Sequence, residues 1–333
     1  MNSETATDRR EDAHAGRRGV LFSLTASALF GAIFFMPTLL QPLTPEQMYG
    51  WRVALALPFM LGLLALVKEW GAIRTIALRL RRQPWLVLVL IVNGHLLGLQ
   101  LWLFAWAPTN GEALSATLGY FLLPLTMVVL GVIVYRERLT GLRLVAVASA
   151  VVGIGAAFIT ADGLSWPIPV IALGYPIYFI SRRKFGLDAP GALCFELAAQ
   201  LPIALFFAMQ PSSLGTIGES PMLIPALLFF GLISAVALSS YIIASRLLTL
   251  GIFGLLGYVE PLLLVLVSTA LLHETIEPNE YMLYGGILLA VILIAIEGVL
   301  EQRRATHQFH DITSDVTGEK PGEEPLTGPI HVV

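Results

Sequence analysis

The sequence predicts an all-α integral membrane protein with ten transmembrane helices in two inverted five-helix repeats. Three observations support this fold class: an apolar composition, basic residues confined to one side, and similarity between the two halves. Of the 333 residues, 56% are hydrophobic and 13% are charged, and the mean hydropathy is +0.78. Soluble domains carry about 25% charged residues, so this chain has too few charges to cover a water-facing surface.

Ten continuous apolar runs have the length that a bilayer requires. A hydrocarbon core about 30 Å thick is crossed by about 20 apolar residues in a helix. Strands of a membrane barrel would alternate apolar and polar residues, whereas these runs do not. The predicted spans are 18–40, 47–67, 85–106, 113–134, 141–160, 166–181, 190–209, 222–243, 252–272 and 281–299.

The spans divide the chain into four parts. Residues 1–17 and 302–333 are polar and charged, which predicts disordered cytoplasmic tails. The first repeat covers 18–160 and the second, inverted repeat covers 161–301. The first apolar run is too long for a signal peptide and lacks a small-residue cleavage site, so we expect it to remain as the first helix.

The basic residues predict the orientation. Every Lys and Arg except Arg52 falls on one side of the predicted membrane, in a tail, in a loop or at the adjoining end of a span. The positive-inside rule places that side in the cytoplasm. We therefore expect a multi-pass protein of the cytoplasmic (inner) membrane with both termini in the cytoplasm.

The second half repeats the first. Residues 28–35 align with 172–179, and residues 135–139 align with 272–276. Pro58 and Pro124 align with Pro202 and Pro261 in the same frames. Because each copy has an odd number of spans, the second enters the membrane in the opposite direction. Such repeats are typical of secondary transporters, whose substrate site lies near the midplane between the copies.

Two charged residues within spans are candidate functional groups, because charge inside a bilayer is costly. Arg52 lies near the outer end of the second span, where its planar guanidinium could bind a carboxylate or phosphate. Its alternative role is to reach the outer headgroups. Glu260 lies deep in the ninth span, before Pro261, and is the candidate for proton coupling. Its alternatives are a structural ion pair, including one with Arg52, and a protonated hydrogen-bond donor.

His95 is a candidate for both substrate binding and proton coupling, because histidine titrates near neutral pH. A packing role is the alternative, since Gly94 and Gly98 form a GxxxG spacing that allows close helix contact. Four aromatic residues with polar tips could line a pocket for an amphipathic ligand, or belong to the interfacial aromatic belt. They are Trp102, Tyr120, Tyr175 and Tyr258.

The sequence lacks the motifs that are typical of other function classes. The chain has no P-loop, no H-E-x-x-H helix and a single cysteine, Cys194, so we expect no catalytic residues, cofactor or metal. The net charge of −3 gives no signal for nucleic acid. The expected partners are a small-molecule substrate and membrane lipids, with a homodimer left open.

Several sequence runs resemble the EamA-type members of the drug/metabolite transporter superfamily, and most closely the RarD permeases. The resemblance covers residues 17–300. Its most specific part is the run 100–108, and further matching runs are 50–52, 93–95, 119–125, 172–179 and 258–261. The resemblance implies an outward permease for small organic metabolites, and the family name is tied to chloramphenicol sensitivity. It implies no particular substrate.

Together these patterns predict a secondary transporter (permease or exporter) of small organic metabolites or amphipathic drugs. Alternating access would carry the substrate through a midplane cavity. Arg52 would bind an anionic group, and Glu260, with His95, would couple protons. Two alternatives stay open: a membrane-embedded enzyme that acts on lipid, and a non-transporting membrane sensor or assembly component.

Overall fold

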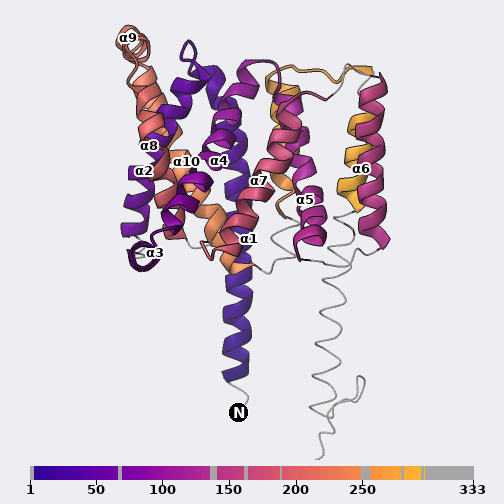
Figure 1. Ribbon diagram of the computed structural model, residues 1–333, viewed down its shortest axis with the longest axis horizontal. Helices are drawn as coiled ribbons and strands as arrows, with labels where there is room; N and C mark the ends of the chain where they lie inside the picture. The colour runs from indigo at the N-terminus through magenta and orange to yellow at the C-terminus, as the bar shows by residue number, and fades with distance from the viewer. Residues whose placement is uncertain are drawn as a thin grey trace, which may run out of the picture.

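The computed structural model describes residues 4–66, 70–135, 141–160, 164–187, 190–248, 256–278, 281–293 and 296. Within these ranges every regular element is helical, and the helices form an elongated bundle (Figure 1). The elements are α1 (Glu4–Leu39), α2 (Pro45–Leu66), α3 (Trp70–Arg82), α4 (Leu86–Thr109), α5 (Ala113–Tyr135), α6 (Gly141–Thr160), α7 (Pro167–Lys184), α8 (Pro190–Ala208), α9 (Pro211–Glu219), α10 (Leu223–Leu247), α12 (Val259–Leu266) and the π-helix η1 (Val267–Leu271). A further apolar helix covers Tyr281–Leu293.

Five of these helices are long and apolar enough to cross a membrane, by length and composition. They are Gly16–Leu39, Pro45–Leu66, Leu86–Thr109, Gly191–Ala208 and Leu223–Ala244. Shorter apolar helices cover Ala113–Met127, Leu144–Ala156, Val259–Leu271 and Tyr281–Leu293. Many of their large apolar side chains are exposed to the surroundings of the bundle. The fold is therefore that of a helical, multi-pass membrane protein.

Helix α1 begins at Glu4, so residues 4–17 are helical where the sequence predicted a disordered tail. Figure 1 shows this part of α1 extending beyond the bundle. The physical reason is that residues 4–15 contain neither glycine nor proline, so nothing ends the helix before it enters the apolar span. The predicted tail at 302–333 lies outside the described residues.

Helix α3 lies in a segment that the sequence predicted as a loop. Its only buried residue is Ile76, and four of its 13 residues are arginines. Arg79 of α3 donates hydrogen bonds to the carbonyl oxygens of Phe185, at 2.6 Å, and Gly186. Those carbonyls follow the end of α7, so α3 binds a neighbouring helix terminus instead of crossing the membrane.

The GxxxG spacing on α4 gives a close helix contact, as the sequence predicted. A Cβ atom on Gly94 would lie 2.7 Å from the carbonyl oxygen of Glu196, and one on Gly98 would lie 2.9 Å from the Gln200 side chain. Both neighbours belong to α8. Only glycine allows α4 and α8 to pack at this distance.

Buried apolar side chains form separate clusters along the bundle. One gathers Phe34, Phe104 and Phe230 with residues of α2, α5 and α12. Another joins α5, α6 and α7 to the helix Tyr281–Leu293, which lies beside α6 in Figure 1. Ser149 of α6 also donates to the carbonyl oxygen of Gly286 in that helix, at 2.8 Å.

The predicted ninth span, 252–272, is not one regular α-helix. Residues 252–255 are outside the described part, residues 257–258 form a turn, and α12 begins at Val259. After Leu266 the helix continues as η1, whose π geometry has i→i+5 hydrogen bonds in place of the i→i+4 bonds of an α-helix. Glu260 therefore lies in the first turn of a helix. The glycines and Pro261 around this point account for the change, because they weaken a regular helix.

Candidate functional site

Arg52 of α2 is almost fully buried, with 1% of its surface exposed. Its Nε donates to Ser234 Oγ at 3.1 Å, and that hydroxyl in turn donates to the carbonyl oxygen of Phe230. The guanidinium carbon lies 5.4 Å from the ring centroids of both Phe104 and Phe230. The planar cation is thus held between two aromatic rings, which attract it through their π faces.

One polar atom of Arg52 remains without a partner. Nη1 is buried and has no hydrogen bond within the part of the chain that the structure describes. The hydroxyl of Tyr120 on α5 lies near the hydroxyl of Tyr175, and the two interact with each other. Buried donors are almost always hydrogen-bonded in proteins. The unpartnered Nη1 of Arg52 therefore marks a position where a ligand could supply the acceptor.

Tyr120 connects Arg52 to further aromatic residues. Its ring centroid lies 5.5 Å from Phe104 and 5.7 Å from Tyr175 of α7. The charge of Arg52 lies within electrostatic range of both tyrosine hydroxyls. The arrangement combines one cation with phenol groups and apolar ring faces, which suits a small amphipathic molecule with an anionic group.

Glu260 completes this group of side chains. It is half-buried and lies close enough to Arg52 for their charges to interact. Tyr175 and Tyr241 are also within electrostatic range of Glu260. We call Arg52, Tyr120, Tyr175, Tyr241 and Glu260 the central cluster. Its members come from α2, α5, α7, α10 and α12, so five helices meet at one place.

Three predicted site residues lie elsewhere. His95 is exposed on α4, and its Nδ1 is 2.7 Å from the Ile91 carbonyl oxygen of its own helix. Tyr258 is buried among apolar residues of α5 and the helix Tyr281–Leu293. Trp102 donates to the Glu46 carboxylate at 3.0 Å, near the start of α2. The structure therefore does not place these residues in the central cluster.

Trp102 belongs to a tryptophan cluster with Trp106 and Trp166. The ring centroids are separated by 5.9 Å for Trp102 and Trp106, 4.7 Å for Trp106 and Trp166, and 6.2 Å for Trp102 and Trp166. Two of the rings belong to α4 and the third precedes α7. The cluster therefore connects these two helices.

The site residues that the sequence predicted did not include Phe104, Phe230, Ser234 or Tyr241. Phe104 lies in the specific run 100–108, so that motif carried a signal for it. Phe230 and Ser234 are four residues apart on one face of α10. Phenylalanine and serine are common in membrane helices, so only their contact with Arg52 distinguishes them.

A second buried polar group lies on α7 and α8. Arg182 and Glu196 form an ion pair at 2.7 Å, and Tyr178 donates to the same Glu196 oxygen at 2.8 Å. Arg182 also donates to the Tyr178 hydroxyl at 2.5 Å. Here the cation and the carboxylate neutralise each other within the protein.

Glu274, after η1, closes the start of α5. Its carboxylate accepts hydrogen bonds from the backbone N–H groups of Ala113 at 2.9 Å and Leu114 at 2.6 Å. Burial raises the pKa of Glu274, and nearby Glu112 raises it further, while the two backbone donors oppose the shift. A carboxylate at a helix N-terminus satisfies donors that have no partner within the helix.

The chain is similar to a known family of transporters. The EamA-like transporter family matches residues 17–159. The chain is 40% identical to the chloramphenicol-sensitive protein RarD of Pseudomonas aeruginosa over 83% of this chain and 93% of that protein. This chain belongs to the EamA-like transporter family, as a RarD-type permease.

Other relatives are also named as a transporter or as RarD. The chain is 37% identical to an uncharacterized transporter of Pasteurella multocida over 86% of this chain and 98% of that protein. It is 28% identical to the protein RarD of Escherichia coli over 89% and 99% of the two chains. One protein of known crystal structure shares the fold, with a TM-score of 0.52 and 17% identity over 84% of this chain and 97% of that chain.

Membership of the EamA-like family makes this RarD-type chain a membrane transporter. It decides against the alternatives of a lipid-modifying enzyme and a non-transporting sensor, because the matched family and the relatives' names are those of transporters. The resemblance found in the sequence runs is confirmed by these matches.

Proposed function

We propose that this transporter moves small organic anions, including amphipathic ones, by alternating access, and that Arg52 binds the anionic group. The unpartnered Nη1 of Arg52 is the observation that carries this proposal. An incoming carboxylate or phosphate would accept a hydrogen bond from Nη1 and supply a counter-charge. The flanking rings of Phe104 and Phe230 orient the guanidinium before the substrate arrives.

The energetics favour a substrate that carries charge. Removing an ion from water costs several kcal/mol unless a partner compensates it. Arg52 is fully buried and has one hydroxyl partner and two ring faces. An anionic substrate would remove most of this penalty, whereas a neutral molecule of the same shape would leave it. Selectivity for anions over neutral isosteres would therefore come from Arg52.

The helix contacts support the inverted repeat as part of this proposal. Gly94 of α4 faces Ala199 of α8, and Gly231 of α10 faces Leu55 of α2. Leu55 corresponds to Ala199 in the frame that aligns Pro58 with Pro202, and Gly94 corresponds to Gly231 in the frame that aligns Pro124 with Pro261. The same contact thus occurs twice between equivalent residues. Two halves with equivalent contacts could exchange arrangements and expose the site to each side in turn.

The same alignment places Glu196 at the position equivalent to Arg52. Glu196 has its counter-ion, Arg182, at 2.7 Å. Arg52 has no carboxylate at ion-pair distance among the described residues, although Glu260 is within electrostatic range. One half therefore has a built-in ion pair at this position. In the other half the counter-charge is left to Glu260 and, in our proposal, to the substrate.

Proton coupling follows if Glu260 and the substrate compete as the counter-charge of Arg52. An ionised Glu260 would repel an anionic substrate and neutralise Arg52 through space. A protonated Glu260 would carry no charge, so the anionic substrate would become the counter-charge of Arg52. Proton and anion would then bind together and cross in the same direction. We place the protein in the inner membrane with both termini in the cytoplasm, as the distribution of basic residues favours.

Ligand-induced stabilisation of the purified protein tests the anion proposal, since a ligand that binds the folded state raises its apparent stability. The probes are benzoate, phenylpyruvate and indole-3-acetate, each compared with its neutral amide. We expect at least one carboxylate to raise the melting temperature while its amide does not. Arg52→Gln should abolish this shift. Arg52→Lys should keep part of it, because lysine retains the charge without the planar fork.

The matched control is Arg81→Gln, which removes an exposed arginine of α3. It should bind the probes as the unchanged protein does. Size-exclusion profiles verify that each variant is folded. Equal shifts with carboxylates and amides, or unchanged binding in folded Arg52→Gln, would contradict the proposal.

A further inference from the structure

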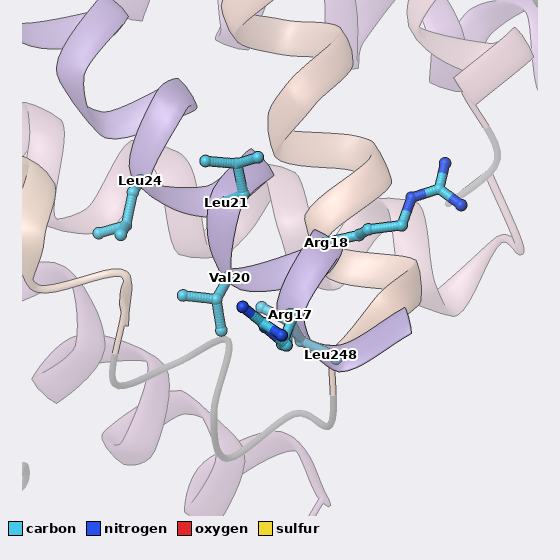
Figure 2. A pocket seen from close by; sticks show the side chains of 7 residues that line it. Arg17, Arg18, Val20, Leu21, Leu24 and Leu248 are labelled. Atoms are coloured by element: carbon cyan, nitrogen blue, oxygen red, sulfur yellow. The ribbon is translucent and has the colours of Figure 1, made fainter. Parts of the chain in front are cut away.

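A groove lies on the surface where the apolar part of α1 begins, against the end of α10 (Figure 2). Its volume is about 690 Å³, which is within the range of small-molecule sites. It combines basic residues at one end with an apolar wall. The lining residues are Gly16, Arg17, Arg18, Val20, Leu21, Leu24 and Leu248.

The α1 residues of the groove follow helical spacing. Arg17, Leu21 and Leu24 are four and three residues apart, so they lie along one face of α1. Leu21 is 66% exposed and Leu24 is 41% exposed. The face therefore has a cation at the point where the span Gly16–Leu39 begins, followed by apolar side chains that continue into the membrane.

The groove has a firm floor because α1 and α10 approach closely. Gly19 is buried, and a Cβ atom there would lie 2.7 Å from the Leu248 side chain. Leu248 is itself 7% exposed. Glycine at this position allows Leu248 to seat against α1. The apolar wall is therefore part of a packed helix contact and does not depend on exposed side chains alone.

Both arginines are exposed, and neither forms an ion pair among the described residues. No acidic residue stands three or four positions from Arg17 or Arg18 on α1, which are the spacings that would neutralise them. Figure 2 shows Arg17 beside Val20 and Leu248, whereas Arg18 extends away from them. The two arginines thus have different relations to the groove.

We propose that this groove binds one anionic phospholipid. The Arg17 guanidinium binds the lipid phosphate, and an acyl chain lies along Val20, Leu21 and Leu24 against Leu248. Arg18 adds a long-range attraction for the negative headgroup without contacting the acyl chain. Basic pockets between membrane helices bind anionic headgroups in this way.

The apolar wall is the reason to assign a lipid instead of a free phosphate. A soluble phosphate would use the arginines alone and leave the exposed leucines without a role. The position at the start of a span places the arginines at headgroup level and the leucines at acyl depth. Every part of the groove then faces the lipid group that matches its polarity.

The test measures lipid binding to the full-length protein in a neutral detergent, by native mass spectrometry. The probes are dioleoyl phosphatidylglycerol and dioleoyl phosphatidylcholine. We expect one phosphatidylglycerol to be retained under conditions that remove phosphatidylcholine. Arg17→Gln should weaken phosphatidylglycerol binding by about fivefold or more, since a basic residue near a lipid surface is worth about 1 kcal/mol. Arg18→Gln should have a smaller effect.

Two further variants separate the headgroup from the chain. Leu24→Trp fills the groove and should weaken phosphatidylglycerol binding while Arg17 is intact. Arg81→Gln removes an exposed arginine outside the groove and should change nothing. Both arginines of the groove are exposed, so their replacement should leave folding unchanged, which the melting temperature in detergent verifies.

Three results would overturn the proposal. They are equal retention of the two lipids, equal weakening by Arg17→Gln and Arg81→Gln, and unchanged binding in Leu24→Trp. Glycerol 3-phosphate is the remaining probe. If it protects the protein against thermal unfolding as well as the lipid does, and Arg17→Gln removes that protection, the site binds soluble phosphate and the lipid assignment fails.

Discussion

The environment of Arg52 depends on a single hydroxyl. Ser234 accepts a hydrogen bond from the Arg52 Nε and passes one to the Phe230 carbonyl oxygen. Hydrogen bonds to charged groups contribute about 1.5–3 kcal/mol. The hydroxyl therefore fixes the direction in which the guanidinium presents its remaining N–H groups.

We expect Ser234→Ala to lower the melting temperature and to weaken carboxylate binding by about tenfold, as the loss of about 1.4 kcal/mol would do. Thermal unfolding and ligand titration of the purified protein measure both effects. Ser240→Ala is the matched control, because Ser240 is also a buried serine of α10 and has no hydrogen bond to Arg52 among those described. Equal losses in both variants would show that Ser234 has no specific role.

Sequence alone could single out Arg52 and Glu260, because charged groups in apolar spans are rare and costly. It could not separate Tyr120 and Tyr175 from Tyr258. All three lie near helix breakers in the sequence, but only the helix packing decides which ones reach Arg52. His95 shows the same limit, since helical phase relative to neighbouring helices decides that it points outward.

At the scale of elements, the start of α5 depends on a distant residue. Glu274 accepts hydrogen bonds from Ala113 and Leu114, although 161 residues separate Glu274 from Ala113. The carboxylate thereby joins the end of η1 to the N-terminus of another helix. Its pKa is raised, chiefly by burial.

This shift makes stability depend on pH. An ordinary glutamate has a pKa of about 4.3. Because the pKa of Glu274 is higher in the folded state, its contribution is complete below the ordinary pKa and is lost as the pH rises through the raised one. Glu274→Gln carries no titrating group. The stability of the unchanged protein relative to Glu274→Gln should therefore fall from pH 4 to pH 7, measured by melting temperature. A difference that grows with pH would contradict this.

Two element boundaries show what composition cannot reveal. Helix α3 is too polar to be recognised by hydropathy, and its position depends on Arg79 meeting the end of α7. The turn at 257–258 lies inside an apolar run, where hydropathy predicts one uninterrupted helix. In both cases tertiary hydrogen bonding and local backbone geometry override the hydropathy pattern.

At the scale of the whole molecule, the central cluster collects side chains from five helices. A change of charge at Glu260 therefore acts where both halves meet. The class of fold followed from composition and from the length of the apolar runs, which reflect solvation by lipid. The approach of side chains from α2, α5, α7, α10 and α12 depends on packing between distant segments, so it required the structure.

We expect Glu260→Gln to separate substrate flux from proton movement. Glutamine keeps the size of the side chain and removes its titration. In vesicles containing the purified protein, flux of a carboxylate identified by the binding screen should lose its response to an imposed proton gradient. His95→Gln is the control and should retain the response, because His95 is exposed outside the central cluster. A preserved gradient response in Glu260→Gln would exclude Glu260 as the coupling group.

The tryptophan cluster has a practical consequence. It contains three of the six tryptophans of the chain, with ring centroids between 4.7 and 6.2 Å apart. Indoles at such spacing exchange excitation energy and are sensitive to small changes in separation. Because the rings span α4 and the start of α7, relative movement of those helices would change the intrinsic emission. The protein therefore carries its own optical reporter, and its conformational cycle can be followed in real time without an attached dye.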